Sequence, residues 1–252
     1  MSSVRRHLLE LSLLAISLVT AIVAFMAVSA DAGEERMTMR HRWQVDASYP
    51  KFGDQAVDSA IAEWLNQSIA DIMESVKDGA DVAFTEDEAS FSIFIDYQTY
   101  SLSDQVLSIL FNITTYPSGA AHPMNAIGTL NFFAGGSSPL RLDDLFSDPG
   151  RALEIMSDNA KPLISEYIAT EGIGLSEEEI AEIIDNDWFS EGSAPTRDNF
   201  AALSLAHDGV RVHFQQYQVL PYVFGSPEFV VPLGKLAPAG PNPKVWLQAG
   251  KK

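Results

Sequence analysis

The stretch Tyr217-Gln-Val-Leu-Pro-Tyr-Val-Phe-Gly225 organises this chain of 252 residues. Two tyrosines bracket Pro221, which cannot donate a hydrogen bond to a sheet, and Gly225 ends the stretch with a residue that tolerates a positive φ. We expect such a segment to leave the edge of a sheet and to present the rings of Tyr217 and Tyr222. The pattern predicts a recognition surface in place of catalytic machinery.

An earlier loop, Tyr116-Pro-Ser-Gly-Ala-Ala-His-Pro123, has a similar character. Its prolines and Gly119 punctuate a turn between two strand-like runs, and its histidine, His122, directly precedes Pro123. His122 could contact a ligand or could pin the loop by bonding a backbone carbonyl, and the pinning role is favoured. The candidate contact residues of the two stretches are Gly119, His122, Pro123, Tyr217, Pro221, Tyr222 and Gly225.

The remaining hydrophobic periodicity predicts an α+β fold with a mostly antiparallel sheet and helices packed on it. Alternation over residues 37–48 predicts one strand, ended by the turn at Tyr49-Pro50. Asp54 is placed to cap one long amphipathic helix over residues 55–77. An antiparallel meander is expected to follow, with strands at residues 91–97, 106–116 and 127–133, the second buried on both faces over part of its length.

The C-terminal half alternates helical and strand patterns. The patterns predict an extended piece at residues 140–146 and a helical stretch at 150–170, with a kink or two abutting helices at Pro162. They also predict an acidic helix at 177–187, opened by the capping box of Ser176 and Glu179. Asp208-Gly209 predicts a hairpin between strands at residues 199–206 and 210–220. A last edge strand is expected at residues 229–233.

These patterns suggest four regions. They are a signal peptide or membrane anchor (residues 1–30), an N-terminal strand–helix module (31–90), a C-terminal domain (91–236) and an extended tail (237–252). Arg5 and Arg6 precede an apolar run that ends in Ala27-Val-Ser-Ala30, which is typical of a signal peptide, although the run could also span a bilayer. We therefore expect an exported protein, either periplasmic or anchored to the inner membrane and facing the periplasm.

The net charge limits the partners. It is −18 for the whole chain, and residues 1–30 contribute two arginines and one glutamate, so residues 31–252 carry −19. A field of this sign repels nucleic acid and anionic lipid and attracts cationic proteins, although it could simply confer solubility.

Signatures of catalysis and of metal binding are missing from the sequence. The chain has no cysteine, no Gly-x-Ser-x-Gly elbow and no histidine pair with metal-ligand spacing. His207 and His213 flank the expected hairpin turn, but such a pair is more often incidental than a ligand set. We expect no enzyme activity, no cofactor and no metal.

Three motifs, in order, resemble a family of bacterial extracytoplasmic domains long classed as a domain of unknown function. The family includes the domain of the anti-sigma factor RsiV and the N-terminal region of the peptidoglycan deacetylase PdaC. Its loop motif is met by Gly119-Ala-Ala-His-Pro123, its leucine-rich helix entry by Leu140-Arg-Leu-Asp-Asp-Leu-Phe146, and its aromatic motif by Tyr217–Gly225. The resemblance covers residues 49–233, with Gln218 in place of the usual glutamate.

The resemblance implies an exported domain that acts by binding, with a lysozyme-like hydrolase or peptidoglycan as its partner. The rings of Tyr217 and Tyr222, with Pro221 and the loop around His122, would form the contact surface. Two alternatives remain open: a glycan-modifying hydrolase that uses acidic residues and His122, and a structural envelope protein without a specific ligand.

Overall fold

The computed structural model describes residues 33–40, 43–79, 91–103, 106–170, 174–207 and 209–246. The expected signal or anchor segment, residues 1–30, lies outside these ranges, as do His41 and Asp208. No helix within them is both long enough and apolar enough to cross a bilayer.

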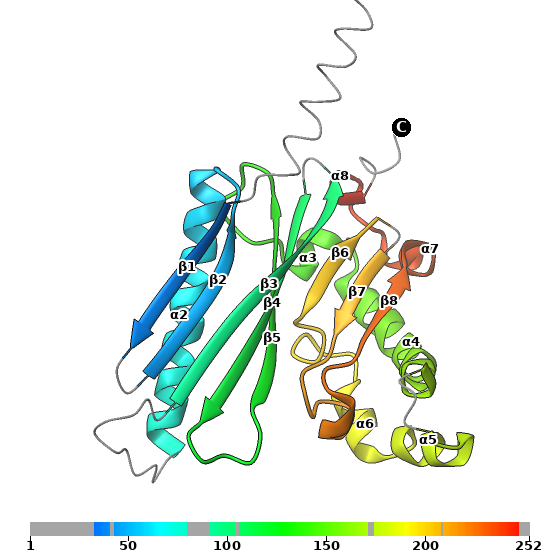
Figure 1. Cartoon of the computed structure of the whole chain (residues 1–252). Coiled ribbons are helices and arrows are strands. Elements are labelled where there is room, and N and C mark those ends of the chain that lie inside the picture. The colour runs from blue at the N-terminus through cyan, green and yellow to red at the C-terminus, as the bar shows by residue number, and fades with distance from the viewer. Residues whose placement is uncertain are drawn as a thin grey trace, which may run out of the picture.

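A five-stranded sheet forms the N-terminal half (Figure 1). Its strands lie in chain order, β1 (Gly33–Arg40), β2 (Trp43–Lys51), β3 (Phe91–Ser103), β4 (Val106–Pro117) and β5 (Met124–Phe133). β2 and β3 pair in parallel, whereas the other neighbours are antiparallel. The sheet is therefore mixed, and the expectation of a mostly antiparallel sheet is wrong here because a helix carries the chain back across the sheet between β2 and β3.

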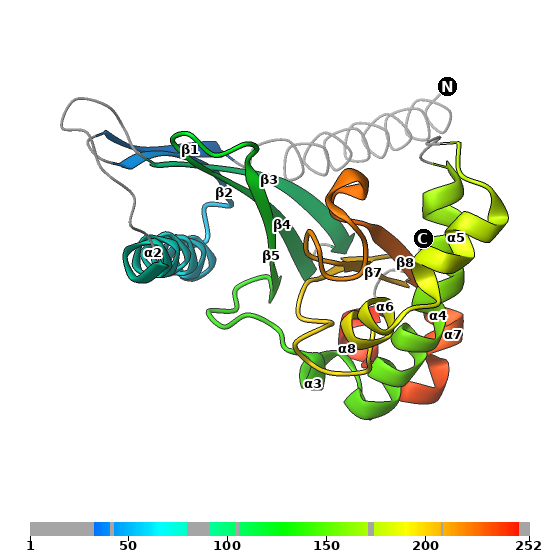
Figure 2. The same cartoon turned by 90° about the horizontal axis from the view of Figure 1, so that it is seen from below.

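That helix is α2 (Gln55–Gly79), and it covers one face of the five-stranded sheet (Figure 2). The Asp54 carboxylate caps it by accepting hydrogen bonds from the Ala56 and Val57 amides at 3.0 and 3.3 Å, as the sequence predicts. Every fourth residue along the inner face is buried, because the helical repeat brings these positions onto one stripe. The buried stripe consists of Val57, Ile61, Leu65 and Ile69.

The first predicted strand is in fact two strands. Alternation over residues 37–48 continues from β1 into β2, which pair as a hairpin with Met37 opposite Ala47. No glycine or proline marks the connection, so nothing in the sequence announces the turn. β2 also continues through Tyr49 and Pro50, where a break is expected.

A second, three-stranded antiparallel sheet lies in the C-terminal half. Its order is β6 (Leu203–Ala206), β7 (Gly209–His213) and β8 (Glu228–Pro232). The helices before it are α3 (Leu142–Leu145), α4 (Pro149–Thr170), α5 (Glu177–Ile184) and α6 (Asp187–Gly192). A 3₁₀ turn η1 (Tyr222–Phe224) precedes β8, and α7 (Leu233–Leu236), η2 (Ala237–Ala239) and α8 (Pro243–Trp246) follow it.

Three expectations for this half are wrong. The piece at residues 140–146 contains a helical turn, α3, where an extended segment is expected. The strand expected over residues 210–220 ends at His213 because the chain then leaves the sheet. The expected extended tail is helical in part, and Val245 and Trp246 of α8 are buried in the core.

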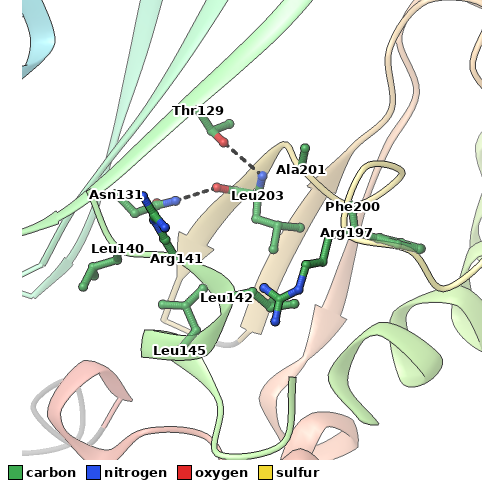
Figure 3. Close-up of a pocket in the computed structure, with 10 residues that line it drawn as sticks. All are labelled: Thr129, Asn131, Leu140, Arg141, Leu142, Leu145, Arg197, Phe200, Ala201 and Leu203. Carbon is green, nitrogen blue, oxygen red and sulfur yellow. Dashed lines mark hydrogen bonds between the residues drawn. The ribbon is translucent and has the colours of Figure 1, made fainter. Parts of the chain in front are cut away.

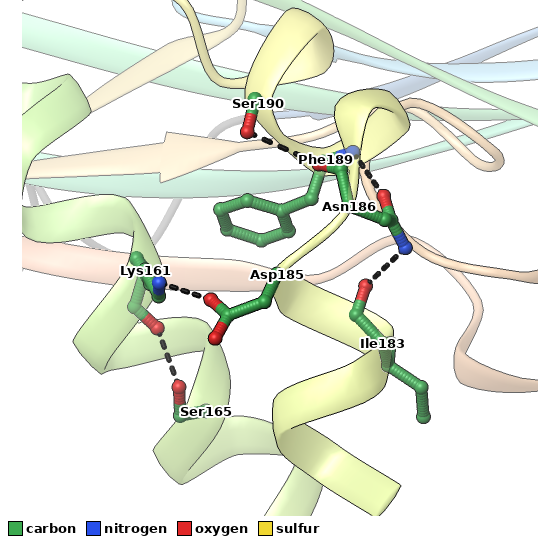
Figure 4. Close-up of polar contacts among 7 residues, drawn as sticks. All are labelled: Lys161, Ser165, Ile183, Asp185, Asn186, Phe189 and Ser190. Atoms are coloured by element: carbon green, nitrogen blue, oxygen red, sulfur yellow. Dashed lines mark hydrogen bonds and ion pairs between the residues drawn. The ribbon is translucent and has the colours of Figure 1, made fainter.

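Polar contacts cap the short helices of this half and join α4 to the end of α5 (Figure 4). Ser176 and Glu179 form the predicted capping box of α5. Lys161 on α4 pairs with Asp185 at the end of α5. Asn186 then caps α6 by accepting a hydrogen bond from the Phe189 amide at 2.8 Å. α4 itself runs through Pro162 as one helix.

The two sheets meet where β6 packs against β3, β4 and β5. The first half of β4 is buried on both faces, as predicted, and its Ser108 hydroxyl accepts a hydrogen bond from the Leu205 amide at 3.0 Å. One hydrophobic cluster, from Val45 to Phe132, joins α2 to the inner positions of β2, β3, β4 and β5, and Met37 of β1 packs against it. The core therefore continues across residue 90, where the sequence suggests a boundary.

Candidate functional site

The segment after β7 is hydrogen-bonded to the free edge of β5. Gln215 accepts a hydrogen bond from the Ile127 amide and donates one to the Ile127 carbonyl, both at 2.7 Å. Gln216 accepts a third from the Asn125 amide at 3.0 Å. Side-chain amides here take the place of a neighbouring strand, which satisfies backbone groups that an edge leaves unpaired. This contact brings the two predicted recognition stretches together, at the lower end of the molecule in Figure 1.

Three of the predicted residues meet there as an aromatic cluster, defined as His122, Tyr217 and Tyr222. The ring centroids of His122 and Tyr222 are 4.2 Å apart, and those of Tyr217 and Tyr222 are 5.8 Å apart. Both separations are in or near the range of favourable ring contacts. Tyr217 is 39% exposed, while the other two side chains are half-buried. The rings thus form one continuous surface from segments about a hundred residues apart.

Tyr217 holds an unusual backbone conformation. Its φ of 66° is the one positive value among the described non-glycine residues. A left-handed conformation costs about 1–2 kcal/mol for a residue with a Cβ, so neighbouring contacts must enforce it. One of them is the Trp188 indole, whose Nε1 donates a hydrogen bond to the Tyr217 carbonyl at 2.9 Å. Such enforced strain is characteristic of functional segments.

Gln218 supplies the other restraint. Its Oε1 accepts a hydrogen bond from the Gln215 amide, and its Nε2 donates to the carbonyls of Gly192 and Asn199, all at 2.9 Å. A carboxylate could not donate these two bonds, so the amide at this position serves the loop structurally.

Pro221 and Gly225 shape the backbone around the rings. Pro221 precedes the turn η1, and Gly225 ends it at φ 66° and ψ −136°, a region that is essentially restricted to glycine. The Tyr167 hydroxyl donates to the Phe224 carbonyl at 2.8 Å and fixes the turn against α4. These two predicted residues are placed as supports of the cluster.

The loop residues divide between support and contact. Gly119 has a φ of 84°, which the turn requires. His122 Nδ1 lies 3.1 Å from the Pro123 carbonyl, in keeping with the predicted pinning role. The His122 ring also contacts the Tyr222 ring. The Tyr116 hydroxyl donates to the Ala120 carbonyl at 3.0 Å.

Further apolar side chains are exposed on the same segments. Met124 is 43% exposed at the start of β5, Val223 is 66% exposed in η1 and Trp188 is 41% exposed on α6. Large exposed apolar side chains that gather in one region often mark an interaction surface. The role of Trp188 was not predicted, and its only sequence signal is a tryptophan two residues after the Asn186 cap of a short helix.

The described histidines are His122, His207 and His213. No group of three or more potential ligands occurs within the described ranges. His213 is buried and contacts the Ser204 hydroxyl at 2.9 Å and the Glu228 carboxylate at 3.2 Å, whereas His207 is exposed in the hairpin turn. The hydrogen bond from His213, aided by Arg211, lowers the pKa of Glu228 against the opposing effect of its partial burial.

Fold and site together define a two-sheet α+β domain with a cluster of three aromatic side chains at its surface. By sequence, residues 143–234 match the family described as "Protein of unknown function (DUF3298)", and residues 40–125 match the family described as "Deacetylase PdaC". Each match covers about a third of the chain, so the chain is similar to one family in its C-terminal half and to the other in its N-terminal half.

One relative and two solved structures extend this result. The chain is 24% identical over 184 residues to the peptidoglycan-N-acetylmuramic acid deacetylase PdaC of Bacillus subtilis, and the match covers 73% of the chain but 36% of that protein. A DUF3298 family protein of Pseudomonas aeruginosa superposes with a TM-score of 0.59 at 16% identity, over 87% of this chain and 98% of that one. A DUF3298 family member from Bacteroides fragilis gives 0.54 at 17% identity, over 88% and 97%. The solved structures share the fold.

Proposed function

We propose that this protein is a cell-envelope binding domain that recognises peptidoglycan through the aromatic cluster. The observation that carries the proposal is the contact among the rings of His122, Tyr217 and Tyr222. It occurs where the backbone of Tyr217 is held in a strained left-handed conformation. A fold held by other contacts has no need of strain at an exposed tyrosine, whereas a binding surface gains from a ring fixed before the ligand arrives.

The chemistry of the cluster suits a glycan. Sugar rings present C–H groups that pack on aromatic faces, and their hydroxyl and acetamido groups form hydrogen bonds at the ring edges. The Tyr217 ring is 39% exposed and Trp188 adds a second exposed ring beside it. A row of aromatic faces with polar edges favours a ligand made of repeated sugars.

Similarity to PdaC supports the choice of polymer. That relative is named for an activity on peptidoglycan, and the match covers about a third of its length. The chain would share with it the part that engages the cell wall. Export to the envelope belongs to the same proposal and rests on the arginines and apolar run of residues 5–30.

A cationic hydrolase of the lysozyme type is the second candidate, and the charge of the chain favours it. Trp188 lies on α6, and α5 and α6 carry exposed carboxylates at Glu177, Glu178, Glu182 and Asp187. An acidic field next to exposed aromatic side chains would steer a cationic protein onto the cluster.

The alternative of a glycan-modifying hydrolase stays a prediction. It would use His122 as an acid or base, and the Nε2 atom of that ring would have to reach the substrate while Nδ1 remains near the Pro123 carbonyl. Within the described ranges His122 contacts this carbonyl and the Tyr222 ring, and no carboxylate forms a hydrogen bond with its imidazole.

Co-sedimentation with purified peptidoglycan tests the first candidate. We expect the Tyr222→Ala variant to remain in the supernatant while the wild type pellets. Phe94→Ala is the matched control, because Phe94 is similarly exposed at 41% but lies on β3. Equal pelleting of all three proteins would overturn the assignment of the cluster.

A further inference from the structure

A second site lies along the same edge of β5. A cavity of about 270 Å³ opens between β5, the start of α3 and the segment 197–203 (Figure 3). Thr129 and Asn131 form its inner wall, and Leu142 and Phe200 line it with apolar surface. The exposed side chains of Arg141 and Arg197 lie at its mouth. The volume lies just below the range of pockets for drug-sized ligands and suits a smaller group.

Asn131 contributes an acceptor without a partner. The residue is 6% exposed, and its Nδ2 donates to the Leu203 carbonyl at 2.9 Å, which fixes the orientation of the amide. Its Oδ1 has no hydrogen-bond partner among the described residues. Thr129 is already engaged, because its Oγ1 accepts from the Leu203 amide at 3.1 Å. A buried acceptor left unpaired is costly, so Asn131 calls for a donor from outside the chain.

Arg141 contributes an available positive charge. Arg197 is neutralised by two hydrogen bonds to Asp143, at 2.7 and 2.9 Å. The guanidinium of Arg141 forms no close ion pair within the described ranges, although its backbone amide bonds the Asp144 carboxylate at 2.8 Å. It acts on Asp143 only at longer range, because the pKa of that carboxyl is held low chiefly by Arg197 and to a smaller degree by Arg141. Arg141 is exposed, so its guanidinium can form hydrogen bonds to an anion that enters the cavity.

We propose that this cavity binds a carboxylate that lies next to an amide N–H, as at the C-terminal residue of a short peptide. The carboxylate pairs with Arg141, the amide donates to Asn131 Oδ1, and a small apolar side chain lies against Leu142 and Phe200. Arginine is well suited to the first contact because its planar guanidinium matches a carboxylate in two hydrogen bonds.

Binding requires a local rearrangement. Asn131 Oδ1 is closed off from solvent, and the Leu140 amide bonds the Asn131 carbonyl at 2.6 Å, which brings the Arg141 backbone against the same residue. Arg141 is exposed and its side chain has several rotatable bonds, so it can turn toward the carboxylate, and the proposal requires that the groups over Asn131 Oδ1 move aside with it.

The inference rests on the proposed function for the source of the ligand. Peptidoglycan carries short peptides with free terminal carboxylates beside its glycan strands. The cavity and the cluster share the β5 edge, since Gln215 binds Ile127 and the cavity begins at Thr129. With about 3.3 Å per residue, the two sites are roughly 10–20 Å apart, near enough for one polymer segment to occupy both.

Calorimetric titration of the full chain with N-acetyl-D-alanyl-D-alanine tests the cavity. We expect saturable binding of this acid and binding at least about tenfold weaker for its C-terminal amide. Arg141→Gln should weaken binding of the acid to the same degree. Arg151→Gln, which removes an exposed arginine of α4 that pairs with Glu154, should bind as the wild type does. In NMR spectra, the side-chain amide signals of Asn131 should shift with the acid.

Absence of saturation, equal binding of acid and amide, or unchanged binding by Arg141→Gln would each overturn the inference. The experiment separates the two proposals. If the dipeptide fails while peptidoglycan still binds through Tyr222, the cavity assignment alone is wrong. If the dipeptide binds while peptidoglycan does not, the proposed function is wrong.

Discussion

At the scale of single residues, Tyr217 shows how a side chain and its backbone can have opposing effects. The ring meets Tyr222 and stands partly exposed, while the φ of 66° is unfavourable for any residue with a Cβ. Trp188 and Gln218 hold that conformation in place. We therefore assign the Tyr217 ring to binding, and we interpret the backbone strain as the energetic cost of holding that ring in position.

A pair of variants at Tyr217 separates these effects. Both Tyr217→Ala and Tyr217→Gly lose the ring, but only glycine relieves the strain, so the glycine variant should be more stable than the alanine variant by about 1 kcal/mol. Both should lose binding to peptidoglycan equally. Chemical denaturation measures the first quantity and co-sedimentation the second. A glycine variant less stable than the alanine variant would mean that the loop relaxes without strain.

Single residues also show which parts of the site the sequence could predict. The positive φ of Gly119 and Gly225, the Pro221 turn and the pairing of His122 with a backbone carbonyl follow from residue type. Their meeting does not, because ring contacts between segments a hundred residues apart depend on the packing of two sheets. The hydrogen bonds of Trp188 to Tyr217 and of Gln215 to Ile127 were missed for the same reason, since tryptophan and glutamine carry no local signal for long-range contacts.

At the scale of elements, the free edge of β5 positions both proposed sites. Gln215 pairs with both backbone groups of Ile127, and Gln216 pairs with Asn125 further along. The loop that carries Tyr217 and Tyr222 is thereby held against the β4–β5 loop that carries His122. We call the two hydrogen bonds between Gln215 and Ile127 the Gln215 clamp, and they take the place of a neighbouring sixth strand at this edge.

Removal of the clamp should affect stability and binding together. Gln215→Ala loses two partly buried hydrogen bonds, so the free energy of unfolding should fall by about 1–3 kcal/mol and binding to peptidoglycan should weaken. Gln216→Ala is the control, because it loses one exposed bond and should change stability by less than about 0.5 kcal/mol. Thermal and denaturant unfolding, with binding in parallel, check both values. Equal effects of the two variants would argue against the clamp.

The β7–β8 pair gives a pH dependence. The bond from His213 lowers the pKa of Glu228 below its usual 4.5, so ionised Glu228 stabilises the fold above pH 4.5 and this contribution disappears as the pH falls through the lowered pKa. We expect Glu228→Gln to be less stable than the wild type at pH 7, with a difference that shrinks on acidification. Denaturation between pH 7 and 3 measures it, with Glu182→Gln of α5 as the control. A difference independent of pH would contradict this.

Elements whose signals are local were predicted well from the sequence. The Asp54 cap, the Ser176 capping box and the hairpin before Gly209 all depend on residues within a few positions of one another. The hairpin of β1 and β2 was missed because its turn has no glycine or proline. The parallel pairing of β2 with β3 was missed because the first strand and the long helix were expected to form a separate module, although a helix between two strands is the connection that parallel pairing uses. The buried helix α8 was missed because its proline-rich approach resembles a linker.

At the scale of the whole molecule, charge and shape point to different partners. The charge of −18 favours a cationic protein, whereas the aromatic cluster and the likeness to PdaC favour peptidoglycan. Salt distinguishes them, because attraction between exposed charges is screened at physiological ionic strength and ring contacts are not. The two sites on the β5 edge further favour a polymer that carries both sugars and peptides.

The most direct measurement is a calorimetric titration of the full chain with soluble peptidoglycan fragments and, separately, with lysozyme. It is run at low and at physiological salt, with Tyr222→Ala in parallel. The account predicts saturable binding of the fragments that survives physiological salt and weakens at least about tenfold in the variant. Attraction to either partner that vanishes with salt and is the same in both proteins would contradict a recognition surface at the aromatic cluster.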